Sequence, residues 1–172
     1  MKLTWFGSDT FRIHAAGSMI VVEGKDRLAG VDHSELVSGA DHVFAFDAAP
    51  TVPAGWKPRA PLKMLEAGEG LRAPDVVQIG NGALAVDADG EAPLILLKRE
   101  VELSGRWVGQ SVVAMVGTNL ARRGESLLLR HAPRLLALAG SDAEVEAAFG
   151  VLPPLLDGTG LVALERALAV EV

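Results

Sequence analysis

The stretch LTWFGSDTFRIH, residues 3–14, indicates the fold of the amino-terminal part of the chain. An apolar run ends at Gly7, Ser8 and Asp9 follow, and Thr10–His14 alternates apolar and polar side chains. Such alternation is typical of a half-buried strand, and glycine next to short polar residues is typical of a tight turn. We therefore expect two strands joined at Ser8 and Asp9, by a turn that either binds a ligand or only satisfies its own backbone.

In the rest of the chain, patterns typical of strands are more numerous than patterns typical of helices. We expect strands at Lys2–Phe6, Thr10–His14, Met19–Val22, His42–Phe46, Pro61–Glu66, Val76–Ile79, Ala83–Asp87, Leu94–Lys98, Gln110–Val116, Gly160–Leu164 and Ala167–Val172, and a strand or a helix at Arg134–Ala139. We expect helices at His33–Ser38, Gly124–His131 and Ser141–Phe149, a helical turn at Pro153–Leu156 and a proline-rich loop at Ala48–Pro61. The pattern predicts an α+β fold in which a few helices cover sheets.

Composition points to one folded domain over residues 1–172. Hydrophobic residues make up 49% of the chain, which is enough for a packed core at this length. There is no cysteine, so disulfides, thiolate metal sites and cysteine nucleophiles are excluded.

Charge and hydropathy narrow the expected partners. The formal net charge is −6, without the basic patch of a nucleic-acid-binding protein. Apolar runs such as Ser111–Val116 are too short to cross a bilayer, and the first residues lack the pattern of a signal peptide. We expect a cytoplasmic protein, of bacterial type, that binds neither nucleic acid nor membrane.

The opening segments MKLTWFG (1–7), TFRIH (10–14), SMIVVEG (18–24) and GADHVFAFDAAP (39–50) resemble the metallo-β-lactamase superfamily, in particular its branch similar to the ascorbate-6-phosphate lactonases. PLKMLEAGEGL (61–71) and GALAVDADG (82–90) are similar to inner strands of that family. The resemblance implies an αββα sandwich, trimmed to fit this short chain.

The zinc ligands of that family are missing from the matching positions. Ser8 stands where the family has its turn histidine, and the segment Asp47–Pro53 has no histidine where the family has His-x-His-x-Asp-His. The chain has four histidines, His14, His33, His42 and His131, and none lies within four residues of another. A hydrolytic zinc site needs three or more ligands and an open position, so we expect no metal and no cofactor.

Two groups of polar residues are candidate sites. Ser8, Asp9 and Asp47 could form a catalytic or ligand-binding cluster, or Ser8 and Asp9 could simply bond the turn backbone. Thr118, Asn119, Arg122 and Arg123 follow a core strand and could bind a carboxylate or phosphate, or the two arginines could form a solvated corner.

Other residues have a structural and a functional interpretation. Ser111 or Ser126 could pair with His131, but neither lies in a Gly-x-Ser-x-Gly elbow. Trp5 fits a strand core. Trp56 and Trp107 could bind a ligand or partner, or could cover sheet edges.

The sequence thus favours a metallo-β-lactamase-like protein without zinc, with a binding or structural role. A homo-oligomer could cover an apolar face left by missing layers. One alternative is a hydrolase with a rearranged site at Ser8, Asp9 and Asp47 that acts on a small ester, lactone or phosphoester. The other is a sensor of a small anionic ligand at the Gly117–Arg123 loop.

Overall fold

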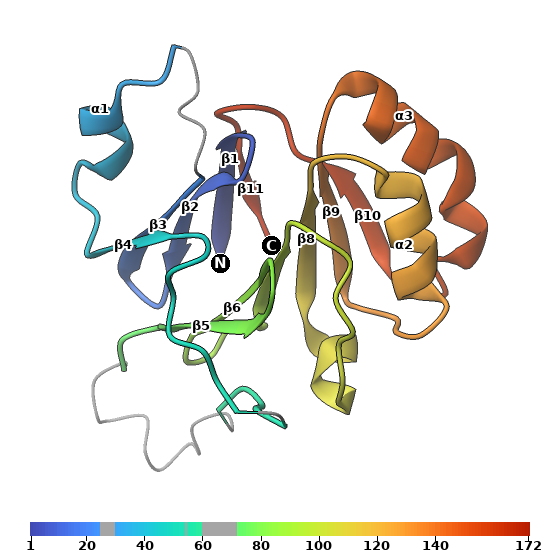
Figure 1. Ribbon diagram of the computed structural model, residues 1–172, viewed down its shortest axis with the longest axis horizontal. Coiled ribbons are helices and arrows are strands. Elements are labelled where there is room, and N and C mark those ends of the chain that lie inside the picture. The colour runs from blue at the N-terminus through green and yellow to red at the C-terminus, as the bar shows by residue number, and fades with distance from the viewer. Residues whose placement is uncertain (25–29, 54, 60–71) are drawn as a thin grey trace.

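The fold contains two mixed β-sheets, shown in Figure 1. The computed structural model describes residues 1–24, 30–53, 55–59 and 72–172. Within these residues one sheet has five strands, in the order β11-β1-β2-β3-β4, formed by β1 (Lys2–Gly7), β2 (Thr10–Ala15), β3 (Ser18–Glu23), β4 (His42–Ala45) and β11 (Ala169–Glu171). The other has six, in the order β10-β9-β8-β7-β6-β5, formed by β5 (Asp75–Gly80), β6 (Ala83–Asp87), β7 (Leu94–Leu97), β8 (Val112–Val116), β9 (Leu135–Ala139) and β10 (Gly160–Ala163).

Helices lie on the outer side of each sheet (Figure 1). The short helix α1 (His33–Val37) lies beside the five-stranded sheet, where Nε of Arg12 on β2 donates to the carbonyl oxygen of Leu36 at 3.1 Å. Helices α2 (Leu120–Leu128) and α3 (Asp142–Val151) lie beside the six-stranded sheet, and 3₁₀ turns occupy Arg106–Gln110 and Pro153–Leu155. The α+β class and the trimmed αββα sandwich predicted from the sequence are confirmed.

A continuous apolar core fills the space between the sheets. On β2, Phe11 and Ile13 point into it and are fully buried, whereas Arg12 and His14 point outward, as the alternation predicts. Trp5 is 4% exposed, which confirms its predicted place in the core. A second core joins α2 and α3 to the outer face of the six-stranded sheet through Ile95, Leu97, Val113, Met115, Leu120, Leu127, Leu136, Leu138, Ala148 and Leu152. Each fully buried side chain of this kind contributes roughly 1.5–3 kcal/mol.

Strand direction brings several strand ends to one edge of the sandwich. Strands β7, β8, β9 and β10 run parallel, and β3 runs parallel to β4. Strands β1, β2 and β3 form an antiparallel meander, so β1 and β3 run in the same direction. Residues that follow β1, β3, β4 and β7 can therefore meet across the two sheets.

Most predicted elements are present, with four differences. Helix α2 begins at Leu120 rather than Gly124, because Asn119 takes a left-handed conformation (φ 57°) immediately before it. Helix α3 continues through Gly150 to Val151. Strand β4, expected over His42–Phe46, ends at Ala45, and it is largely exposed because it forms one edge of its sheet. The Arg106–Gln110 turn was not predicted.

Three further expectations concern a strand that could have been a helix, a segment that is not described, and membrane-spanning helices. Arg134–Ala139 is a strand rather than a helix. The expected strand at Pro61–Glu66 lies outside the described residues. None of the helices that the structure describes has the length and apolar character needed to span a membrane.

Candidate functional site

The turn between β1 and β2 presents Ser8 and Asp9 at one edge of the sandwich. Gly7 and Ser8 have positive φ angles of 107° and 44°, which make the turn tight. The indole Nε1 of Trp5 donates to the carbonyl oxygen of Ser8 at 2.9 Å, and the Ser8 hydroxyl donates to Oδ1 of Asp9 at 3.2 Å. These bonds turn Asp9 inward, where it is 4% exposed.

Lys98, which follows β7 in the opposite sheet, compensates this buried carboxylate. Its ammonium forms an ion pair with Oδ2 of Asp9, an oxygen shielded from solvent. The same ammonium lies 3.9 Å from Oδ2 of Asp47 and 5.6 Å from the ring centroid of Phe46, within cation–π range. We call Asp9, Asp47 and Lys98 the edge cluster. It links the ends of β1, β4 and β7.

The structure thus brings two predicted residues, Asp9 and Asp47, to one cation, with Ser8 bonded to the first. Lys98 was not predicted to be part of the site. A lone lysine after the apolar run Leu94–Leu97 carried no signal beyond marking the end of a strand. Its contact with Asp9 spans most of the first hundred residues and depends on how the two sheets pack.

The four histidines do not converge. Nε2 of His33 lies 2.6 Å from Oε1 of Glu23, and Nε2 of His131 lies 3.0 Å from the carbonyl oxygen of Leu103. His42 contacts the ring of Phe44 on the edge strand, and His14 is exposed on β2. Within the described part of the chain, no group of three or more His, Asp or Glu side chains could hold a metal ion.

The Thr118–Arg123 loop is arranged differently from the solvated corner considered above. Arg123 is buried and donates to the carbonyl oxygens of Val116, Thr118 and Leu97 at 2.9, 3.1 and 2.8 Å, so the solvated interpretation is wrong for this residue. Burial lowers the pKa of its guanidinium from the usual value. Arg122 is exposed, as that interpretation expects.

The same loop offers few free donors to an anion. The backbone N–H of Leu120, at the start of α2, donates to Oε2 of Glu144 on α3 at 3.0 Å. Thr118 and Asn119 are exposed beside it. A carboxylate of the chain itself therefore occupies the position that an anionic ligand would use at this helix end.

The serines considered as nucleophiles do not contact His131. The Ser111 hydroxyl is buried and donates to the carbonyl oxygen of Val108 at 2.7 Å. The Ser126 hydroxyl donates to Oε1 of Glu100 at 2.7 Å. The geometry does not assemble a serine–histidine pair.

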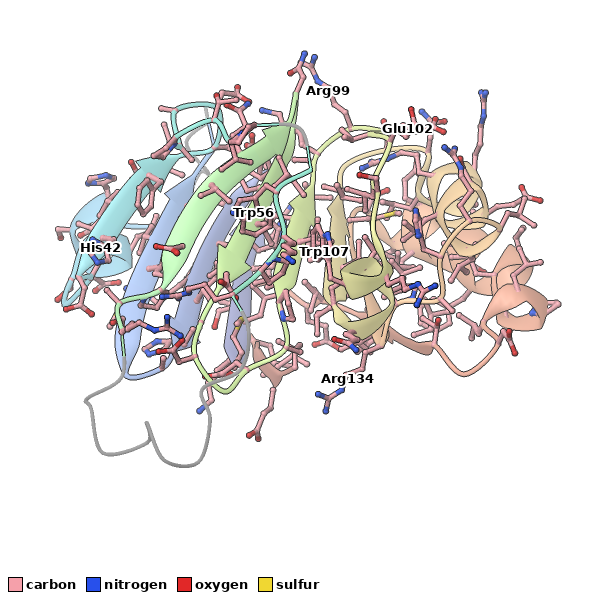
Figure 2. All side chains as sticks on the ribbon, turned by 90° about the horizontal axis from the view of Figure 1, so that it is seen from below. His42, Trp56, Arg99, Glu102, Trp107 and Arg134 are labelled. Atoms are coloured by element: carbon pink, nitrogen blue, oxygen red, sulfur yellow. The ribbon has the colours of Figure 1, made fainter. Side chains whose placement is uncertain are left out.

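A cleft of about 680 Å³ lies at the other end of β7. Ala92 and Pro93, which line it, precede β7, whereas Lys98 of the edge cluster follows this strand. Trp56 and Trp107 stand side by side at the cleft (Figure 2), with ring centroids 5.5 Å apart and ring planes at 88°. Neither tryptophan is fully buried.

Comparison with known proteins adds two structural neighbours. No protein-family model and no curated protein matches the chain. A metallo hydrolase from the hyperthermophilic archaeon Ignicoccus hospitalis aligns over 99% of this chain and 98% of its own, with a TM-score of 0.49 and 12% identity. A putative Zn-dependent hydrolase of the metallo-β-lactamase superfamily from Thermotoga maritima aligns over 96% and 99%, with a TM-score of 0.48 and 14% identity.

The first neighbour is described as a metallo hydrolase and the second as a putative Zn-dependent hydrolase. At the turn where the resemblance of the opening segments places a metal ligand, the present chain has Ser8 and the ion-paired Asp9.

Proposed function

We propose that this chain is a non-catalytic relative of the metallo-β-lactamase-fold hydrolases, with a binding or structural role and without zinc. The observation that carries the proposal is the ion pair between Lys98 and Asp9, 3.9 Å from Asp47. It lies where the sequence resemblance places the metal ligands of the family.

Electrostatics support this interpretation. A divalent cation would need the two carboxylates as ligands, but the ammonium of Lys98 already compensates their negative charge. The ammonium would also repel a metal ion at the same place. The buried Oδ2 of Asp9 already contacts the ammonium, so a metal ion would have to displace Lys98 before this oxygen could become its ligand.

The second candidate is a hydrolase with a rearranged site at the same edge. The hydrogen bond from the Ser8 hydroxyl to Asp9 favours it, because a carboxylate next to a hydroxyl can accept its proton. This activity would act on a small ester, lactone or phosphoester without metal.

Metal analysis combined with a hydrolysis screen tests the proposal. The purified chain is expected to contain far less than one Zn, Mn or Fe per molecule, and to leave p-nitrophenyl acetate, γ-butyrolactone and bis-p-nitrophenyl phosphate unhydrolysed. A stoichiometric metal would overturn it. Hydrolysis that disappears in both Ser8→Ala and Asp9→Asn but persists in Arg122→Gln would instead establish the second candidate.

Self-association stays a prediction. Leu129, Phe149 and Val151, on or next to α2 and α3, are exposed apolar side chains that a second copy could cover. Light scattering during size-exclusion chromatography measures the oligomeric state, and a monomeric mass would contradict the predicted homo-oligomer.

A further inference from the structure

The cleft beside Trp56 and Trp107 has the size and lining of a small-molecule site. Ligand pockets typically measure about 300–1,000 Å³ and combine apolar walls with a few polar groups. This cleft measures about 680 Å³ and is lined by the loop that carries Trp56, the β6–β7 connection, and the segment around Trp107. It lies at the end of the sheet opposite the edge cluster, so it is separate from the site proposed above.

The indole rings of Trp56 and Trp107 line one part of the cleft. They pack edge to face, and Gly105 leaves room for this arrangement, because a β-carbon there would lie 2.8 Å from Cδ1 and 2.9 Å from Nε1 of Trp107. Gly105 also has a φ of 101°, a conformation that favours glycine. Trp56 and Trp107 are both partly exposed, and both line the cleft.

An ion pair joins the Trp56 segment to the sheet at the cleft. Asp87, 4% exposed, accepts from both the backbone N–H and Nε of Arg59, at 2.9 and 3.0 Å. Nη2 of Arg59 also donates to the backbone carbonyl oxygen of Asp87 at 2.7 Å. Arg59 belongs to the segment that carries Trp56, so these bonds attach that segment to the end of β6.

The charges left over in the cleft are positive. The lining carboxylates all have cationic partners: Asp87 pairs with Arg59, Asp89 with Arg72, and Glu91 with the amino terminus. The lining cations Lys57 and Arg106 are exposed. Neither forms a hydrogen bond or ion pair with any of the described residues. Two unpaired cations next to an apolar wall complement an anion that carries a flat apolar body.

We propose that this cleft binds a small aromatic carboxylate, with its ring against Trp56 and Trp107 and its carboxylate paired with Lys57 and Arg106. The proposal concerns a different end of β7 from the edge cluster, and it does not depend on the absence of zinc there. The metal and hydrolysis assays concern the other edge, so either proposal can fail while the other holds.

Titration with 2-naphthoate, followed by NMR of the tryptophan indole N–H groups, tests the cleft. The signals of Trp56 and Trp107, assigned with Trp→Phe variants, are expected to shift in a saturable way. The signal of Trp5, which is buried away from the cleft, is expected to stay in place. Two further probes separate the contribution of the ligand's charge from that of its aromatic ring. The cation 2-naphthylmethylammonium carries the opposite charge, and acetate lacks the ring. Both are expected to bind at least about tenfold more weakly, a difference of about 1.4 kcal/mol.

Variants locate the contacts. The double variant Lys57→Gln/Arg106→Gln is expected to weaken naphthoate binding by about tenfold or more, and Trp107→Phe to weaken it less. The matched control Arg99→Gln removes an exposed cation that follows Lys98, at the end of β7 opposite the cleft, and this variant is expected to bind as the wild type does. Equal affinity for the naphthyl cation, unchanged binding in the double variant, or no saturable shift of the two cleft indoles would each overturn the proposal.

Discussion

A β-carbon on Gly24 would lie 1.8 Å from Oδ1 of Asp9, so the backbone that leaves β3 closes directly over this carboxylate. The backbone N–H of Gly24 also donates to the Thr10 hydroxyl at 3.1 Å. The inward position of Asp9, and with it the ion pair to Lys98, therefore depends on the absence of a side chain at residue 24.

Gly24→Ala is expected to displace Asp9 and to lower the free energy of unfolding by about 2 kcal/mol, because overpacking at a closed site costs this much. Urea denaturation measures the change. The same substitution in an Asp9→Ala background is expected to cost much less, because the clashing carboxyl group is gone. Equal costs in the two backgrounds would show that the contact does not exist in solution.

Lys98→Met is expected to lower the free energy of unfolding by about 3 kcal/mol, because it leaves the shielded carboxylate of Asp9 without its cation. Adding Asp9→Asn to this variant is expected to recover part of the loss, as a double-mutant cycle measures. Lys2→Met, on the exposed side of β1, is the matched control. If the two lysine variants unfold at the same urea concentration, the ion pair does not contribute to the free energy of unfolding.

Arg123→Met is expected to lower the free energy of unfolding by about 3 kcal/mol, because three carbonyl oxygens at the ends of β7, β8 and the following loop lose a charged donor. Arg122→Met changes an exposed neighbour on the same helix and is expected to stay within about 0.5 kcal/mol of the wild type. Thermal and urea unfolding of the pair give the comparison. Similar losses in both would contradict the assigned role of Arg123.

Two helical glycines are expected to respond in opposite directions to alanine. Gly150→Ala on α3 has open space and is expected to stabilise the chain by about 1 kcal/mol through helix propensity. At Gly124 on α2, a β-carbon would lie 2.7 Å from Cδ1 of the buried Leu152, so Gly124→Ala is expected to be destabilising. Melting temperatures that rise in both variants would mean that α2 and α3 pack less closely than described.

The hydrogen bond from Arg72 holds the pKa of Asp89 below its usual value. This pair therefore contributes stability above the unfolded-state pKa of about 3.9, and the contribution is lost as the pH falls through the lower folded-state pKa. The difference in unfolding free energy between the wild type and Asp89→Asn is expected to shrink between about pH 6 and about pH 3. Glu146→Gln, on the exposed side of α3, is the control. A difference independent of pH would contradict the pairing.

Local patterns were sufficient for most of the elements. The alternation of Thr10–His14, the Asn81-Gly82 turn and the caps at Asp32 and Ser141 all lie within a few residues of the structure they specify. The predicted start of helix α2 was wrong because the helix follows Asn119, which has a left-handed conformation. The neighbouring residues give no signal for that conformation.

The sequence predicted the acidic residues of the candidate site but not their cationic partner. Ser8, Asp9 and Asp47 stand out because they fall at strand ends and match positions of a known family. Lys98 and Arg123 do not, since each acquires its role from carboxylates or carbonyl groups far away in the sequence. The Trp56–Trp107 contact joins two segments that are far apart in the sequence, and for that reason both tryptophans had two interpretations before the fold was known.

The amino-acid sequence by itself determined the α+β class, the strand–turn–strand opening and the absence of cysteine chemistry, because hydrophobic periodicity, turn residues and composition are local or additive properties. Only the tertiary structure decided that Lys98 faces Asp9 across the sandwich, that Arg123 is buried, and that Lys57 and Arg106 lie at a cleft beside two indoles. The physical reason is that charge pairing and cleft shape depend on distances between segments far apart in the chain, and packing of the two sheets sets those distances.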